Sequence, residues 1–235
     1  MIAAAVVAAF VIIAVGAPHV APYDPIKQNF LAIRKAPSAA YRLGTDEVGR
    51  DILSRLDLGA RASLLAGVIP VSIALVVSIP LGLLSGCTGG WLDGLIMRIT
   101  DAMLAIPFLI VAIALAAFLG PSLTNAMIAI GIAALPTFLR LARGTALAIT
   151  TEEYIESARS LGCSPVRIAV RHVLPNILPP LLIQSSLTAA AAIIAEASLS
   201  FLGLGQQPPA PRGAACSTPP SATSCRRPGW RSTRD

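Results

Sequence analysis

The sequence predicts an all-α protein that crosses a membrane several times as a bundle of helices. Of its 235 residues, 55% are hydrophobic and only 13% are charged, and the mean hydropathy is +0.74. Soluble globular domains carry about 25% charged residues. Apolar runs near the ~20 residues that a spanning helix requires also recur along the chain. These observations indicate that lipid is the main solvent of the folded protein.

The first expected span covers residues 1–17. This stretch is almost wholly apolar and stops at Pro18, but at about 1.5 Å per residue it is somewhat short for a hydrocarbon core of about 30 Å. A cleaved signal peptide is the alternative, and it is disfavoured because no basic region follows Met1 and no A-x-A cleavage site stands out. A start codon assigned too late would explain both the short span and the missing basic lead-in.

A polar, turn-rich, extracytoplasmic loop is expected over residues 18–61. From Asp46 onward the spacing suits a short amphipathic helix with Ile52, Leu53 and Leu56 on one side. We expect this loop to lie against the membrane surface.

Four further apolar spans are expected within a core that covers residues 62–200. They occupy residues 62–84, 99–119, 123–142 and 177–200, which makes five spans with the first. Prolines lie inside these spans or at their edges, among them Pro70, Pro80, Pro107 and Pro136. Each proline removes a backbone hydrogen bond, a loss that neighbouring helices in a packed bundle can compensate. Gly82 and Gly86 lie one helical turn apart and permit close helix contact.

The segment between the last two spans, residues 143–176, has the local signals of two short helices. Thr150 and Glu153 suit a capping box, and Gly162 suits a left-handed helix end. The apolar face of the first helix is expected to consist of Tyr154, Ile155, Ala158 and Leu161.

The second helix of this segment is expected to begin after Ser164, a good N-cap, with Pro165 at the first helical position. It would run through Arg167 and Arg171 and end at the approach of Pro175. The segment is therefore predicted to be a helix, a glycine turn and a second helix that project from the membrane. By the residue pattern alone, a solvated basic loop is an equal alternative.

Within this segment, the chain carries Glu156-Ser157-Ala158, three residues, Gly162, nine residues and His172-x-Leu174-Pro175. This pattern resembles the E-A-A loop of ABC importer permeases, E-A-A-x3-G-x9-I-x-L-P, from which Ser157 and His172 depart. The stretches LGTDEVGRDILSRLDLGARASLLAG and EASLSFLGLGQQPP are similar to segments of the C-type permease subunit of dipeptide, oligopeptide and nickel importers. The resemblance implies a bundle of six spans, of which five are present here.

The resemblance also implies the roles of single residues. In that family the E-A-A loop forms the coupling helix, which docks on a cytoplasmic ATPase and passes its motion to the bundle. Glu156 and Arg159 would meet the ATPase surface, Gly162 would be the hinge, and Leu174-Pro175 would anchor the lever to the fifth span. The coupling residues implied in this way are Glu156, Ser157, Ala158, Arg159, Gly162, Leu174 and Pro175.

By the same resemblance, the partners would be a B-type sister permease, two cytoplasmic ABC ATPase subunits, an extracytoplasmic solute-binding protein and membrane lipid. ATP and Mg²⁺ would be bound by the ATPase subunits, so no cofactor is expected in this chain. The expected location is the bacterial cytoplasmic membrane. The expected solutes are di- or oligopeptides, with nickel or another small solute as the alternative. No nucleic acid is expected to bind. Residues 212–235 alone supply +4 of the formal net charge of +6, so the charges of the remaining 211 residues are close to balanced.

Docking on an ATPase requires the coupling loop to be cytoplasmic, which puts residues 18–61 outside and the amino terminus inside. The positive-inside rule disagrees. The first loop carries Lys27, Arg34, Lys35, Arg42, Arg50, Arg55 and Arg61, whereas the coupling loop and its edges carry only Arg140, Arg143, Arg159, Arg167 and Arg171. The motif outweighs the rule, because a long first loop that also contains five acidic residues is weak topological evidence.

Two acidic residues lie in or near the spans, where a carboxylate is by default a functional candidate. Asp101 lies at the start of the third span, and it is expected to pair with Arg98 one helical turn away. Glu196, inside the fifth span near its outer end, is a candidate for lining the translocation path.

Two other classes of function fit the sequence less well. A polytopic membrane enzyme would need a catalytic constellation, but the chain has two histidines and neither a G-x-S-x-G nor an H-E-x-x-H motif. A self-energised transporter would need the phosphate-binding motif G-x-x-x-x-G-K-[ST], which this sequence does not contain. A proton-coupled transporter would need a relay of titratable groups, for which a single buried glutamate is weak evidence. The four cysteines have no metal-ligand spacing, so no metal site is expected.

The tail over residues 201–235 changes character after Pro211, where the family resemblance stops and Arg, Pro, Ser, Thr, Cys and Ala dominate. Such a composition is typical of GC-rich DNA read out of frame. Back-translation from Arg212 with a shift of one base allows WGSMLNTAQRYLLPAPWMAIYPG, which is similar to the family's outer segment before its last span. We therefore expect a frameshift after about residue 211 and impaired or no transport by the chain as written. A natural disordered tail is the alternative.

Overall fold

The computed structural model describes residue 16, residues 23–24 and residues 27–205. The span expected over residues 1–17, apart from Gly16, and the tail from residue 206 lie outside this part. The described residues contain helices and no β-strand, which confirms the all-α prediction. The elements are η1 (Phe30–Ala32), α2 (Ile52–Thr88), α3 (Gly90–Leu104), α4 (Phe108–Leu119), α5 (Leu123–Thr150), α6 (Glu153–Ser160), α7 (Pro165–Ile168), the π-helical segment η2 (Ala169–Val173) and α8 (Leu174–Phe201).

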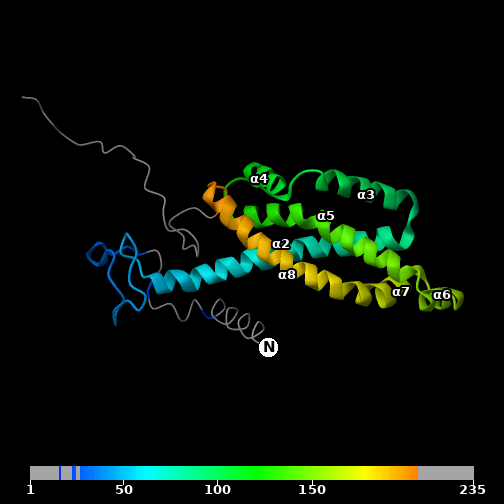
Figure 1. The fold of residues 1–235 in the computed structure, drawn as a ribbon, viewed down its shortest axis with the longest axis horizontal. Coiled ribbons are helices and arrows are strands. Elements are labelled where there is room, and N and C mark those ends of the chain that lie inside the picture. The colour runs from blue at the N-terminus through cyan, green and yellow to red at the C-terminus, as the bar shows by residue number, and fades with distance from the viewer. Residues whose placement is uncertain (1–15, 17–22, 25–26, 206–235) are drawn as a thin grey trace, which may run out of the picture.

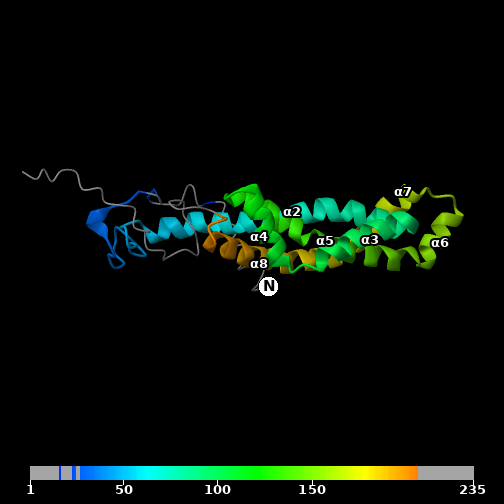
Figure 2. The ribbon, with the colours of Figure 1, turned by 90° about the horizontal axis from the view of Figure 1, so that it is seen from above.

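Three helical stretches of the described residues are long and apolar enough to cross a membrane. They are α2, α5 and the continuous helix Pro165–Phe201, and α3 with α4 adds a fourth if the bent pair counts as one span. Figures 1 and 2 show α2, α5 and α8 side by side along the long axis of the molecule. The predicted number of five spans stays a prediction, because the remaining span would lie within residues 1–17.

Helix α2 begins at Ile52 and runs for 37 residues without a break. Asp51 caps it, because its side chain accepts a hydrogen bond from the backbone N–H of Ser54 at 2.9 Å. At about 1.5 Å per residue the helix is about 55 Å long, so it extends beyond a hydrocarbon core of about 30 Å. The separate amphipathic helix expected from Asp46 is therefore wrong. Its apolar residues form the first turns of α2, since no helix-stopping residue separates them from the span.

The span expected over residues 99–119 is broken in two. Helix α3 begins already at Gly90, α4 begins at Phe108, and the chain bends by 90° between them. Pro107 lies at the break, where it has no N–H to donate and disfavours a helical conformation for the residue before it. The prolines inside α2 and α5 leave those helices continuous, so a proline alone did not predict the break.

Helix α5 lies at the centre of the bundle, in contact with α2, α3, α4 and α8 (Figure 1). Glycines of α2 allow the closest approach. A Cβ added at Gly82 would lie 2.5 Å from the Cβ of Ala142, and one added at Gly86 would lie 2.7 Å from the Cβ of Ala146. The close helix contact predicted for these two glycines is confirmed.

The loop of residues 27–51 is held by polar contacts around Asp46. The carboxylate accepts hydrogen bonds from the backbone N–H groups of Val48 at 3.0 Å and Arg50 at 2.9 Å, and it pairs with the side chains of Arg50 at 2.9 Å and Arg55 at 2.5 Å. Burial by itself raises the pKa of Asp46, but the hydrogen bonds from Arg50 and Val48, together with the charge of Arg50, outweigh burial and hold the pKa below its usual range. Because Arg55 belongs to α2, the network joins the loop to the first turn of that helix.

Candidate functional site

The segment predicted to couple to an ATPase lies at one end of the bundle. Figures 1 and 2 place α6 and α7 at this end and the loop of residues 27–51 at the opposite end. Helix α2, which is longer than a hydrocarbon core is thick, extends from that loop toward the coupling end. The two loops therefore lie on opposite sides of a membrane that the bundle crosses.

Helix α6 begins without a side-chain cap. Its N-cap residue is Glu152, and Thr150 is the last residue of α5, where its hydroxyl donates a hydrogen bond to the carbonyl of Leu147 at 2.8 Å. The capping box predicted for Thr150 and Glu153 is therefore wrong, because α5 continues past its apolar stretch and includes Thr150. Glu153 and Glu156 still favour the start of α6, since negative side chains stabilise the positive end of a helix.

Two of the four apolar residues predicted for the inner face of α6 are buried. Ile155 is fully buried and Ala158 is 9% exposed, whereas Tyr154 is 45% and Leu161 is 85% exposed. The hydroxyl of Tyr154 instead accepts a hydrogen bond from the side-chain amide of Asn176 at 3.2 Å. Leu161 follows the last turn of the helix, so it leaves the face that Ile155 and Ala158 share.

Gly162 ends α6 in the left-handed conformation, as predicted, with φ of +80°. Two hydrogen bonds close the turn: the N–H of Gly162 donates to the carbonyl of Arg159 at 2.9 Å, and the N–H of Cys163 donates to the carbonyl of Ala158 at 3.1 Å. This is the Schellman pattern, which satisfies carbonyls that a helix end otherwise leaves unpaired. A Cβ at Gly162 would meet no atom within 4 Å, so the turn requires glycine for its backbone conformation and not for space.

The second helix starts as predicted but does not end at Pro175. Ser164 caps it by accepting a hydrogen bond from the N–H of Arg167 at 3.4 Å. The chain then passes through η2 into α8 without a break, and the N–H of Leu174 donates to the carbonyl of Ala169, five residues back. Such a widened turn accommodates a proline, whose ring would clash with the carbonyl four residues before it. Helix α7 is therefore continuous with α8.

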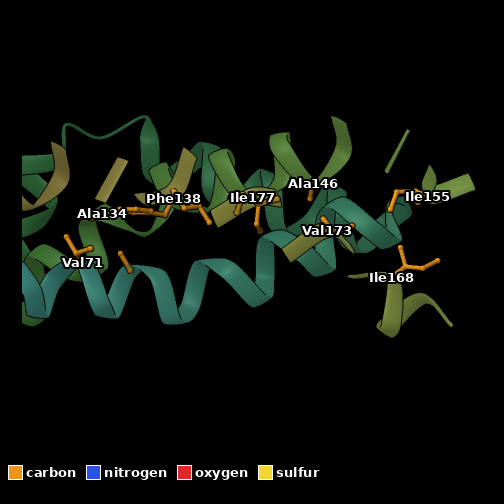
Figure 3. Close-up of a cluster of buried hydrophobic side chains, with 11 residues drawn as sticks. Val71, Ala134, Phe138, Ala146, Ile155, Ile168, Val173 and Ile177 are labelled. Carbon is orange, nitrogen blue, oxygen red and sulfur yellow. The ribbon is translucent and has the colours of Figure 1, made fainter. Parts of the chain in front are cut away.

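The buried side chains of the coupling segment join the core of the bundle (Figure 3). Ile155 of α6 and Ile168 of α7 belong to the same buried cluster as Val173, Ile177 and Phe138. Ile168 is 4% exposed, and the other four side chains are fully buried. Because protein interiors are close-packed, a displacement of α6 or α7 is passed to α5 and α8 through these contacts.

Most residues implied by the E-A-A resemblance lie on the outer surface of this segment. Five are exposed, namely Glu156, Ser157, Arg159, Gly162 and Pro175. Ala158 packs inward, and Leu174 is half-buried against the core cluster. Within the described part of the chain, no group of three His, Cys, Asp or Glu side chains could hold a metal ion.

Two families match the sequence. Residues 78–215 match the binding-protein-dependent transport system inner membrane component, and residues 1–37 match the N-terminal TM domain of oligopeptide transport permease C. The chain belongs to the family of binding-protein-dependent transport permeases. This finding confirms the resemblance to ABC importer permeases, and it makes the chain an inner-membrane subunit that works with an ATPase and a substrate-binding protein.

Relatives of this permease are similar over most of the chain. It is 46% identical over 212 residues to the probable D,D-dipeptide transport system permease protein DdpC of Escherichia coli K12, which covers 90% of this chain and 71% of that protein. It is 46% identical over 201 residues to the di/tripeptide transport system permease protein DppC of Pseudomonas aeruginosa, with coverage of 83% and 66%. It is 42% identical over 202 residues to the glutathione transport system permease protein GsiD of Pectobacterium atrosepticum, with coverage of 85% and 66%. The permease spans about two thirds of the length of these relatives.

The fold of the permease also occurs in a solved transporter. A chain of the MetNI methionine ABC transporter in an inward-facing conformation matches with a TM-score of 0.58 at 23% identity, over 66% of this chain and 77% of that chain. At this identity the likeness shows the fold alone.

Two ion pairs between helices of the permease escaped sequence reasoning. Asp93 of α3 pairs with Arg143 of α5 through two contacts of 2.6 and 2.7 Å, and the Ser85 hydroxyl of α2 also donates to Asp93. Asp101 pairs with Arg140 of α5 and not with Arg98 as expected. The partners lie 50 and 39 positions apart in the sequence, so no local pattern could signal them.

Glu196 is half-buried in the last two turns of α8, a helix whose first residue, Leu174, belongs to the coupling segment. Its carboxylate accepts a hydrogen bond from the hydroxyl of Ser200 at 2.7 Å. A role for Glu196 in the translocation path stays a prediction.

Proposed function

We propose that this permease is the C-type subunit of an ABC importer that moves di- or oligopeptides into a bacterial cell. The observation that carries the proposal is 46% identity, over 90% and 83% of the chain, to permeases named for D,D-dipeptides and for di- and tripeptides. The relative named for glutathione also favours a peptide over nickel as the solute.

The coupling segment would act as a lever. The exposed residues Glu156, Ser157 and Arg159 would contact the ATPase, and Gly162 would fix the angle between α6 and α7. Leu174 and Pro175 would anchor the lever where η2 passes into α8. A push on α7 would then move α8 as a rigid body, because the helix is continuous and its buried side chains belong to the bundle core.

ATP and Mg²⁺ would be bound by the ATPase subunits, and this chain would contribute no catalytic residue. The given sequence contains no phosphate-binding G-x-x-x-x-G-K-[ST] motif, which supports this proposal. So does the family's description as a transport component.

The complete importer would contain a B-type sister permease, two ATPase subunits and a solute-binding protein. Two permease chains would face each other, because five largely apolar spans cannot enclose a path for a polar solute alone. The coupling segment would be cytoplasmic, and the loop of residues 27–51 would face the binding protein. Crosslinking in membranes that contain the sister chain and the ATPase tests the assembly, and recovery of monomers alone would contradict it.

We also propose that the tail after about residue 211 is read out of frame. Resequencing of the gene and mass spectrometry of the expressed protein test this proposal. An intact frame through codon 212, together with detection of the tail as written, would overturn it.

Uptake into vesicles tests the function. The importer is assembled from the resequenced gene, its sister permease, the ATPase subunits and the binding protein, in vesicles without a proton gradient. We expect a labelled dipeptide to cross the membrane only when ATP is hydrolysed. Uptake that persists without the ATPase subunits, or that a proton gradient alone drives, would contradict the proposal.

A further inference from the structure

Helix α5 exposes a side that does not suit lipid. Its exposed residues are Thr124, Thr137, Arg140, Gly144 and Ala148, and none of them is a large apolar residue. Helix α2, by contrast, exposes Val68 and Val76, and α8 exposes Leu182 and Ile183. The last four exposed residues of α5 recur every three or four positions, so they form one stripe along the helix. A stripe of small, polar and charged residues indicates contact with water or protein and not with lipid tails.

A groove of about 450 Å³ follows this stripe. It is lined by Leu104 of α3, Gln184 of α8 and, from α5, Thr137, Arg140, Leu141, Gly144 and Thr145. Gly144 leaves space in the groove, because a Cβ at this position would meet no atom within 4 Å.

Arg140 of this lining pairs with Asp101 of α3, which lies three residues before Leu104 of the lining. Both side chains remain more than half exposed, at 57% and 61%. Arg140 lies about 15 Å along α5 from the end of the helix at Thr150, inside a helix that is long and apolar enough to cross a membrane. A charged side chain that faces lipid is costly, and charges inside membrane bundles face a water-filled cavity or another charge. Because both side chains of this pair are still more than half exposed, a water-filled groove suits them better than lipid tails do.

We propose that this groove is part of the solute path, and that the pair of Asp101 and Arg140 binds the charged termini of a peptide in transit. The proposal rests on the proposed peptide function and adds the residues that recognise the solute. A peptide carries an ammonium group at one end and a carboxylate at the other. The ammonium group donates hydrogen bonds to Asp101, and the fork of N–H donors on Arg140 holds the carboxylate. Neither side chain is left unpaired in this exchange, because each replaces its present partner with one end of the peptide.

Thiol labelling tests whether the groove contains water. Thr137→Cys places a thiol in the groove, and Leu182→Cys places one on the apolar surface of α8, where Leu182 is 65% exposed. With the labelling of the parent chain subtracted, we expect a charged thiol reagent to label the first variant at least tenfold faster in the assembled importer. Equal rates would overturn the hydrated groove.

Filling the groove tests whether solute passes through it. Gly144→Leu adds a side chain that this chain has room for, and it removes a glycine that weakens the helix. Gly94→Leu is the matched control, since Gly94 is an exposed helical glycine of α3, outside the groove, whose added Cβ also meets no atom within 4 Å. We expect Gly144→Leu to lower dipeptide uptake at least tenfold while ATP hydrolysis and subunit assembly persist. Unchanged uptake, or an equal loss in the control, would overturn the path.

Substrate protection tests the ion pair. A dipeptide supplied with its binding protein and ATP should slow the labelling of Thr137→Cys, and Asp101→Asn or Arg140→Gln should remove most of this protection. Undiminished protection in both variants would overturn the contact with the termini. Loss of co-purification with the sister permease would instead show a subunit interface at the groove and would also overturn the proposal. If the parent importer moves no dipeptide with ATP, the proposed function itself fails, which distinguishes that outcome from a failure of the groove alone.

Discussion

The two ends of the bundle are held by different forces. At the coupling end, Ile155 and Ile168 are buried in the same cluster as the side chains of α5 and α8. At the opposite end, the loop of residues 27–51 is held by hydrogen bonds and ion pairs around Asp46. Close-packed apolar contacts transmit displacement to the helices that they join, whereas the largely buried ion pairs around Asp46 join the loop to the first turn of α2. This difference supports the proposal that the permease receives force at the coupling end.

The largest loss of transport should come from Gly162→Val, at the coupling end. A β-branched residue in the left-handed conformation costs about 1–2 kcal/mol, and it changes the angle between α6 and α7. We expect dipeptide uptake to be lost while the protein still inserts, as measured by vesicle uptake and membrane fractionation. Gly162→Asn is the control, because asparagine tolerates this conformation. Normal uptake by the valine variant would refute the coupling role.

Removal of the buried contact should separate ATP hydrolysis from transport. Ile155→Ala truncates a fully buried side chain, which lowers the free energy of unfolding by about 2–5 kcal/mol. We expect the assembled importer to hydrolyse ATP with strongly reduced uptake, because α6 no longer moves with the core. Leu161→Ala, at a position that is 85% exposed, should change the thermal stability little. Equal destabilisation by both substitutions would contradict this account.

Charge reversal on the outer surface should weaken docking without disturbing the core. Glu156 is exposed, so Glu156→Lys should reduce co-purification with the ATPase more than it reduces membrane insertion. Quantitative pull-down and membrane fractionation measure the two effects. A parallel loss of insertion and co-purification would indicate a folding defect instead.

The smallest effect on transport should come from the polar end. The folded-state pKa of Asp46 is lowered from 3.8, so its charge stabilises the loop above that pH, and the contribution is lost as the pH falls through the lower folded value. We expect Asp46→Asn to increase hydrogen exchange over residues 27–51 at neutral pH and to leave uptake nearly unchanged. Glu47→Gln is the control, because the pair of Glu47 and Arg34 is mostly exposed. Equal hydrogen exchange over residues 27–51 in the two variants would contradict the role of Asp46 in holding this loop.

Local signals in the sequence were reliable where a few neighbouring residues decide the structure. Gly162 ends a helix with a positive φ and Ser164 caps the next one, because both depend on hydrogen bonds within a few residues. The same reasoning misplaced Thr150 as a cap and Pro175 as a helix end. Thr150 is the last residue of α5, which is longer than expected. A π-helical turn before Pro175 lets the second helix continue into α8.

The sequence by itself determined that the chain is an apolar helical membrane protein with an E-A-A coupling segment, because apolar length and motif spacing are properties of short stretches. Only the tertiary structure decided that Asp101 pairs with Arg140, that Asp93 pairs with Arg143, and that Ile155 joins the core of the bundle. These contacts join helices far apart in the sequence. They exist because α5 packs between its neighbours, and no local pattern of residues specifies that arrangement.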